Sequence, residues 1–228
     1  MPVIRDRTTL ANITEIEGGI SAYRSTVSQQ IGDSFCVASS TTTMAAALAA
    51  NSAVFVMQLS QQAPVIAYIE RVRIEFVTLV NFTTSVVAGR RLSLLKGGAT
   101  LITAFSGGIS LAALGQIVPK INTQGSNASW FSAVNGGEIR IATTGAITTT
   151  GIIVESTFAS DFTLSSAGVA GSFREYLYST VNRAASPIQI LPGQFFLIRN
   201  PVAMDAAGTW QANIMVDWRE VPLYRQTF

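Results

Sequence analysis

The segment Trp210–Trp218 alternates between apolar and polar side chains almost without exception. One face would carry Trp210, Ala212, Ile214, Val216 and Trp218, and the other Gln211, Asn213, Met215, Asp217 and Arg219. A period of two residues predicts a β-strand with one buried face, which sets the fold class. Just upstream, Ile190–Pro201 contains a Pro-Gly turn that leads into a second strand. We expect the two strands to form an antiparallel pair closing one face of a β-sandwich.

Further strands are expected along the chain, wherever β-branched and apolar residues alternate between turn signals. They cover residues 53–59, 65–80, 86–96, 138–142 and 146–154. In the 65–80 run, Val72, Ile74 and Phe76 face one side and Arg71, Arg73 and Glu75 the other. With seven to nine strands and closely spaced turns, the sequence predicts an all-β, antiparallel β-sandwich, and we expect its topology to be a jelly roll.

The amino-terminal part of the chain has a different character. Residues 1 to about 35 show no sustained period, and Ser39–Ala50 reads as a capped start followed by a run of alanines, which favours a short helix. We therefore expect an N-terminal arm with a short helix over residues 1–50 and the sandwich domain over 51–228. A further helical turn is expected around Phe173, Tyr176 and Leu177. The first residues lack the apolar core of a secretory signal, so we expect folding in a cytoplasm.

Charge is scarce in this chain. Charged residues make up 12% of the sequence, against a usual share of about 25%, and the mean hydropathy is +0.38. Much of the surface is therefore expected to face another chain, in a homo-oligomer. The net charge is only +2, with the cationic groups spread mostly singly, so no nucleic-acid-binding surface is predicted.

A long uncharged stretch runs from Gly97 to Pro119, 23 residues in all. Its length could suggest a membrane span. However, Gly-Gly pairs at Gly97 and Gly107 interrupt it, polar Ser and Thr residues are interspersed, and no aromatic or basic belt flanks it. We expect no membrane contact, and interpret the stretch as strands and turns at a subunit interface.

Groups that carry catalysis are largely missing. The chain contains no histidine and one cysteine, Cys36, which excludes imidazole-based triads, most zinc sites and an internal disulfide. The remaining carboxylate pairs are Glu70/Glu75, Glu15/Glu17 and Asp217/Glu220. Each has an arginine within a few positions, which favours surface ion pairs over a raised pKa. No catalytic residue, cofactor or enzymatic activity is therefore predicted.

Metal and phosphate motifs are absent as well. The glycine-rich runs match neither a Walker loop nor a dinucleotide fingerprint, and they are interpreted as turn glycines. Asp161, Asp205 and Asp217 are possible oxygen ligands for calcium but lack the spacing of a calcium loop, so capping roles are favoured and no metal site is predicted. Arg71 and Arg73 share a strand face with Glu75, which favours a cross-strand row of salt bridges over a phosphate site.

The aromatic residues provide one candidate ligand site. Trp210 and Trp218 share a face with aliphatic residues, so a core position is expected for both. Trp130 instead lies between Ser and Asn residues in a loop-like stretch. An exposed tryptophan of this kind could stack on a sugar ring, which makes Trp130 the single candidate ligand-binding residue.

Several blocks of the sequence resemble a group of bacteriophage virion proteins of capsid-accessory type. The blocks are 50–57, 69–78, 138–146, 191–200 and 208–221. The charge-free 97–137 region departs from the shorter, more polar loop expected there. The resemblance implies a virion structural protein without a catalytic motif, and no functional residues are carried over from it.

The most concrete form of this expectation is a capsid decoration or cement protein. Such a protein is expected to form a homo-oligomer, most simply a trimer, to bind the major capsid protein, and to reside in the virion after synthesis in the host cytoplasm. It would bridge neighbouring capsomers and stabilise the shell. The alternative is a tail or fibre component with a carbohydrate-binding jelly-roll module, in which Trp130 would contact the sugar.

Overall fold

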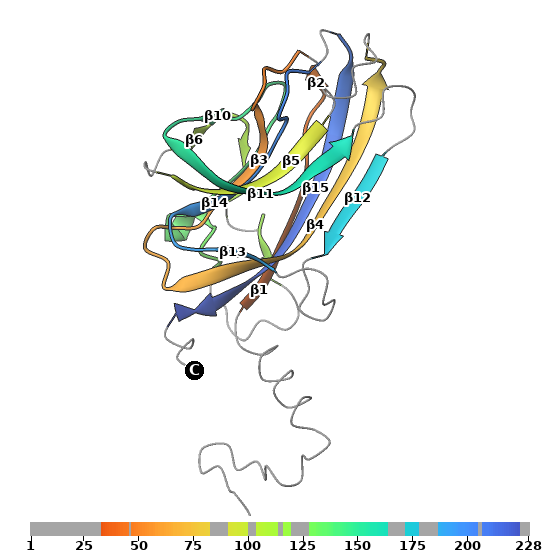
Figure 1. Cartoon of the computed structure of the whole chain (residues 1–228). Helices are drawn as coiled ribbons and strands as arrows, with labels where there is room; N and C mark the ends of the chain where they lie inside the picture. Colours follow the sequence, from red (N-terminus) through yellow and green to blue (C-terminus); the bar gives the residue numbers. More distant parts are fainter. Residues whose placement is uncertain are drawn as a thin grey trace, which may run out of the picture. The chain divides into compact units, whose positions relative to one another are not determined.

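The computed structural model describes residues 33–45, 47–82, 91–99, 104–113, 116–119, 128–163, 172–177, 187–204 and 207–223, with the side chains of 156–163 and 172–177 excepted. By its internal contacts the chain divides into Met1–Gly32 and Asp33–Phe228. Every described residue therefore belongs to the second unit, which is built from β-strands (Figure 1).

Two antiparallel sheets form the layers of this unit (Figure 1). The seven-stranded sheet contains β1 (Asp33–Ser40), β2 (Met44–Ala45), β4 (Val65–Val80), β8 (Val118–Pro119), β12 (Ser172–Leu177), β13 (Ile188–Ile190) and β15 (Thr209–Pro222). The six-stranded sheet contains β3 (Ala53–Gln58), β5 (Arg91–Ala99), β7 (Ile109–Ser110), β9 (Glu138–Ile141), β11 (Ile152–Thr163) and β14 (Gln194–Arg199). A small third sheet pairs β6 (Phe105–Ser106) with β10 (Thr148–Thr149). The all-β, antiparallel β-sandwich predicted from the sequence is confirmed.

The longer strands pair in a nested order. Taken along the chain, the eight main strands are β1, β3, β4, β5, β11, β12, β14 and β15. The first pairs with the eighth, the second with the seventh, the third with the sixth and the fourth with the fifth. The β4–β15 and β5–β14 pairings then join these hairpin-like pairs into the two sheets. Jelly-roll topology itself stays a prediction.

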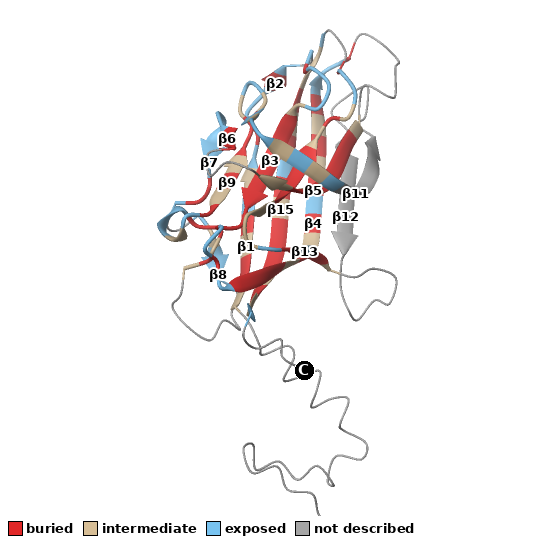
Figure 2. Cartoon of the chain, turned by 60° about the vertical axis from the view of Figure 1, so that its left-hand side comes forward, coloured by how far each residue is buried: buried red, intermediate tan, exposed pale blue. Residues whose placement is uncertain are grey.

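The core lies between the two sheets, where Figure 2 shows buried residues along the strand interiors. Trp210 and Trp218 are both fully buried, which confirms the core position expected for them. The Trp218 ring stacks on Phe35 with a centroid distance of 5.8 Å and meets Phe131 edge-on at 5.4 Å. Such pairs add about 0.5–1.5 kcal/mol beyond the burial of their area. The alternation of β15 therefore fixes which face of the seven-stranded sheet is internal.

A bulge in β4 keeps its apolar residues on that internal face. Opposite β15, Arg71 pairs with Asp217 and Ile69 pairs with Trp218, so Glu70 is the extra residue. After the bulge, every second residue from Val72 onward is buried, up to Thr78. Before the bulge, every second residue counted back from Ile69 is buried as well. A one-residue insertion shifts the alternation by one, so both halves of this 16-residue strand face the core.

The predicted pairing of the last two strands was wrong. β14 lies in the six-stranded sheet between β5 and β3, whereas β15 lies in the other sheet between β4 and β1. The two strands thus belong to opposite layers. Only the short β13, which precedes the Pro-Gly turn, lies in the same sheet as β15. Strong periodicity in two neighbouring segments showed that both are strands, but it carries no information about which layer each one joins.

The helix predicted over Ser39–Ala50 was also wrong for the described residues. β1 continues through Ser40, and Met44–Ala45 pairs with the start of β15. Thr41 exchanges two hydrogen bonds with Ala212, one from its backbone N–H and one to its hydroxyl, each 2.9 Å long. Met44 is fully buried. These tertiary contacts outweigh the helix propensity of a run too short to be helical alone. Residues 33–45, assigned to the arm, are therefore part of the sheet.

Two smaller expectations are corrected as well. Residues 172–177, expected to include a helical turn, form β12 and pair with β4. Gly97 and Gly98, interpreted as turn glycines, lie inside β5. A Cβ atom at Gly97 would collide with the carbonyl of Ile153 and the ring of Phe195, so glycine is needed there for close strand packing. Gly136, by contrast, is a true turn glycine with φ of 76°.

Candidate functional site

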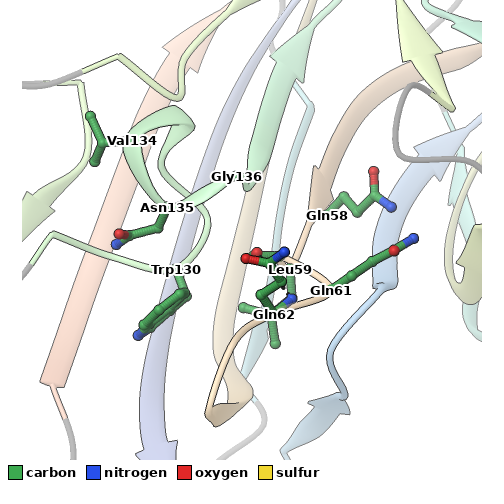
Figure 3. A pocket seen from close by; sticks show the side chains of 9 residues that line it. Gln58, Leu59, Gln61, Gln62, Trp130, Val134, Asn135 and Gly136 are labelled. Atoms are coloured by element: carbon green, nitrogen blue, oxygen red, sulfur yellow. Dashed lines mark hydrogen bonds between the residues drawn. The ribbon is translucent and has the colours of Figure 1, made fainter.

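A depression lies beside Trp130, between the segment that follows β3 and the segment that precedes β9 (Figure 3). Its volume is about 450 Å³, within the range of small-molecule sites. The residues that line it are Gln58, Leu59, Ser60, Gln61, Gln62, Trp130, Val134, Asn135 and Gly136. Figure 3 shows Trp130, Val134 and Asn135 on one side and the glutamines on the other. The structure therefore places the one ligand residue predicted from the sequence at a concave surface.

Backbone hydrogen bonds fix the glutamine side of the depression. The N–H of Leu59 donates to the carbonyl of Gln194 at 3.0 Å, which continues the pairing of β3 and β14 past the end of β3. The N–H of Ser60 then donates to the carbonyl of Trp130 at 3.2 Å, and so joins the two sides directly. Ala63 donates back to the carbonyl of Ser60 at 3.2 Å, closing a tight turn. Gln61 and Gln62 lie at the exposed tip of this turn.

The opposite side is a compact loop with one turn of 3-10 helix, η3 (Ala133–Asn135). The Asn135 carboxamide donates to the carbonyls of Ala128 and Ser129, at 2.8 and 3.0 Å. Gly137 follows, and a Cβ atom there would collide with the backbone of Trp130 and Phe131. The loop thus closes on itself through its own polar groups, which position Trp130.

A buried carboxylate holds this loop to the sheet. Glu220 of β15 is 4% exposed and accepts hydrogen bonds from the hydroxyl of Ser129, from the backbone N–H of Trp130 at 3.1 and 3.2 Å, and from the indole N–H of Trp218 at 2.9 Å. The same carboxylate therefore joins a core tryptophan to the backbone of the candidate ligand residue. Hydrogen bonds to an ionised acceptor are about twice as strong as neutral ones.

Burial raises the pKa of Glu220, and the hydrogen bonds from Ser129, Trp218 and Trp130 oppose that rise only in part. Asp33 of β1 is its register partner in the β1–β15 pair, and its charge raises the pKa of Glu220 further. The pKa of Asp33 is itself raised by burial. Two carboxyl groups with raised pKa values thus lie at one end of the sandwich, next to the Trp130 loop.

Of the carboxylates considered as pairs from the sequence, those of Glu70, Glu75, Asp217 and Glu220 are described, and each has a partner other than a second carboxylate of its pair. Glu70 forms an ion pair with Arg219 at 3.5 Å, and Glu75 accepts a hydrogen bond from Asn213 at 3.1 Å. The surface role expected for Glu220 was wrong, because the residue is buried. Its position could have been found from the strand pattern: the alternation that buries Trp218 also turns Glu220 inward. Glu15 and Glu17 lie outside the described residues.

The salt bridges predicted for the charged face of β4 are confirmed at Arg71. Arg71 forms an ion pair with Asp217 across the β4–β15 pair, with 3.7 Å between Nε and Oδ2. Asp217 is buried and Arg71 is partly exposed. Cys36 is half-buried and lies beside Asp217 in the β1–β15 register.

No group of His, Cys, Asp or Glu side chains that could hold a metal ion occurs among the described residues. Of the three aspartates considered for calcium, Asp205 lies outside the described residues, as does the side chain of Asp161. Within the described part of the chain, the structure also contains no helix with the length and hydropathy needed to cross a membrane.

Comparison of the chain with protein-family models, with curated proteins and with solved structures gives no match. The fold and the site by themselves define the protein as an antiparallel β-sandwich with a depression lined by a tryptophan and by side-chain amides. The resemblance to phage virion proteins stays a prediction.

Proposed function

We propose that this chain is a non-enzymatic structural protein of a bacteriophage virion, of the capsid decoration or cement type. In this role it forms a homo-oligomer, most simply a trimer, and binds the major capsid protein across the capsid lattice. The observation that carries the proposal is the nested pairing of the eight main strands, together with the scarcity of charge.

The nested pairing supports jelly-roll topology as part of this proposal. A jelly roll is a long antiparallel hairpin rolled into two sheets, so its strands pair first with last, second with seventh, and so on inward. The order of the main strands here follows that scheme. Viral capsid proteins and lectins are prominent users of the jelly roll. Because a fold alone does not define a function, the surface has to supply the second argument.

The outer face of the β1–β15 pair supplies that argument. Most of its side chains are small or uncharged, namely those of Ser34, Cys36, Ala38 and Ser40 of β1 and of Gln211, Asn213 and Met215 of β15. Two charged residues of β15, Asp217 and Arg219, lie at one end of the same face, opposite Cys36 and Ser34. Ala38 is exposed and lies opposite Met215. The part of this face around Ala38 and Met215 is uncharged and so costs little to desolvate, and depletion of charge characterises the centres of protein interfaces. We assign this face to the contact with a neighbouring chain.

Co-sedimentation with particles tests the proposal. Purified protein is mixed with phage particles from which it is missing, and its oligomeric state is measured separately by light scattering. We expect an oligomer that pellets with the particles at saturating stoichiometry. Ala38→Arg should abolish pelleting or assembly without unfolding the protein, and Gln189→Arg, on the exposed side of β13, should have no effect. A monomer that never pellets with particles would overturn the proposal.

A further inference from the structure

The side-chain carboxamides of the three glutamines that line the depression make no hydrogen bond to other described residues. These glutamines are Gln58, Gln61 and Gln62. Two amides elsewhere in the structure are engaged: Gln194 donates to Glu155 at 3.0 Å, and Asn200 donates to the carbonyls of Ala49 and Val202. Each free carboxamide offers two donors and one acceptor, so the depression presents a dense set of neutral hydrogen-bonding groups.

The chemistry of the lining selects against charged ligands. None of the lining residues has an acidic or basic side chain. The nearest charges in the register are Glu138, the partner of Gln58, and Arg140 two residues further along β9. These two neutralise each other in an ion pair of 2.8 Å. A phosphate, sulfate or carboxylate would gain no countercharge here, because anion sites depend on Arg, Lys or a cluster of N–H groups.

Trp130 provides the apolar element of the site. Its side chain packs against the hydrophobic core yet remains partly exposed, and it lines the depression. Figure 3 shows it beside Asn135 and Val134. No acceptor for its indole N–H is recorded within the described residues. A planar ring next to hydroxyl-binding amides matches a pyranose, which has an apolar face of C–H groups and a rim of hydroxyls.

The site is also formed in advance of binding. Glu220 fixes the backbone of Trp130, and Ser60 ties that backbone to the glutamine turn. Asn135 closes the loop from within. A ligand therefore does not have to order the loop, which lowers the free-energy cost of binding.

We propose that the depression between the Gln58–Gln62 turn and Trp130 is a binding site for a neutral oligosaccharide. One sugar ring stacks on the indole of Trp130, and the carboxamides of Gln58, Gln61 and Gln62 bind hydroxyl groups along the oligosaccharide. Glu220 is a positioning residue, which acts through the backbone of Trp130 and does not touch the sugar. The site adds to the lattice role proposed above and does not depend on it.

Binding to a printed panel of oligosaccharides tests the site. The panel includes neutral glucose, galactose, mannose and N-acetylhexosamine oligomers, together with sialylated, sulfated and phosphorylated counterparts. Binding of the full chain to the strongest neutral oligosaccharide is then measured by titration calorimetry. Trp130→Ala is expected to weaken it about tenfold or more, as truncation of a central aromatic contact does. Gln61→Ala and Gln62→Ala, at exposed positions, are expected to weaken it severalfold each.

Gln189→Ala is the matched control, because it removes an exposed carboxamide from β13, outside the depression. It should bind like the unchanged protein. Thermal unfolding of each variant separates a lost contact from a lost fold, and the exposed glutamines keep the test valid if Trp130→Ala is unstable. The proposal is overturned if no neutral oligosaccharide binds, if binding survives both glutamine variants and Trp130→Ala, or if only anionic glycans bind.

Discussion

Removing the buried carboxylate of Glu220 is expected to be among the most damaging single changes in this protein. Glu220→Ala leaves the Ser129 hydroxyl, the Trp130 N–H and the Trp218 indole N–H without their acceptor. Each stranded buried donor costs about 1–3 kcal/mol. The three costs do not add in full, because the loop can relax and because the variant no longer desolvates a carboxylate. We expect a loss of about 3–5 kcal/mol in the free energy of unfolding, which is less than the largest sum of the three costs.

Glu220→Gln separates the hydrogen bonds from the charge. The amide oxygen can take the place of Oε1, which accepts from Ser129, Trp218 and Trp130. The amide nitrogen then replaces Oε2, whose one recorded donor is the Trp130 N–H. One of the contacts is therefore lost, and we expect a cost near 1 kcal/mol at neutral pH.

The same variant should change the pH dependence of stability. Burial raises the pKa of Glu220 above its ordinary value of 4.5. Between 4.5 and the raised value, the folded protein binds more protons at this site than the unfolded chain does. The free energy of unfolding therefore falls as pH rises through that window. Glu220→Gln should remove this part of the slope, while the contribution of the same sign from Asp33, whose pKa is also raised, remains.

Urea denaturation of the three proteins, at several pH values from 4 upward, provides the measurement. Glu155→Ala is the control, because it removes an exposed carboxylate that accepts from Gln194, and its effect should stay within about 0.5 kcal/mol. If Glu220→Ala were as stable as the unchanged protein at neutral pH, the carboxylate would not be what secures the Trp130 loop. If Glu220→Gln kept the full pH slope, Glu220 would not be its source.

Two further substitutions test the packing. Gly97→Ala should destabilise the protein by about 1–3 kcal/mol, because the added Cβ would collide with the Ile153 carbonyl and the Phe195 ring. The control is Gly145→Ala, which has no neighbour within 4 Å and should leave the thermal midpoint nearly unchanged. Equal midpoints for the two variants would contradict the packing of β5 against β11. Phe131→Ala removes a fully buried ring that meets Trp218 edge-on and should cost about 3–5 kcal/mol in chemical denaturation, and a loss below 1 kcal/mol would show that the Trp130 loop is not part of the core.

Several strands of this fold were predictable, because a half-buried strand records its burial in its sequence. β1 and β12 were not predicted, and the run 146–154, expected as one strand, is divided between β10 and β11. The run 65–80 was predicted with the bounds that β4 has in the structure. The strands at 53–58 and 138–141 differ from expectation by one residue at the end. Each of them is bounded by turn residues and shows either alternation or a continuous apolar run, and both patterns follow directly from the pleat.

Strand partners were not predictable in the same way. The pairing expected between the last two strands failed because a sandwich places sequential strands in opposite layers as readily as side by side. The alanine-rich run after Ser40 was mistaken for a helix, since local propensity cannot register the contacts of Thr41 and Met44 with β15. These contacts join residues far apart in sequence, so they are decided by the whole fold.

Only part of the candidate site could be predicted from the sequence. Trp130 was identified from its polar neighbours, but the glutamines of the 58–62 turn were not, because only the fold brings them opposite Trp130. Glu220 was assigned to the surface from its arginine neighbour. Its inward position follows from the alternation that begins at Trp210, so the signal was present and was outweighed by residue type.

Quantitative mass spectrometry of purified phage particles tests the proposed function most directly. The quantity measured is the number of copies of this chain relative to the major capsid protein. A decoration protein that covers the lattice should be present in many copies per particle and in a fixed ratio to the capsid subunit, as a symmetric assembly requires. Absence of the chain from washed particles, or a count of only a few copies, would contradict the account.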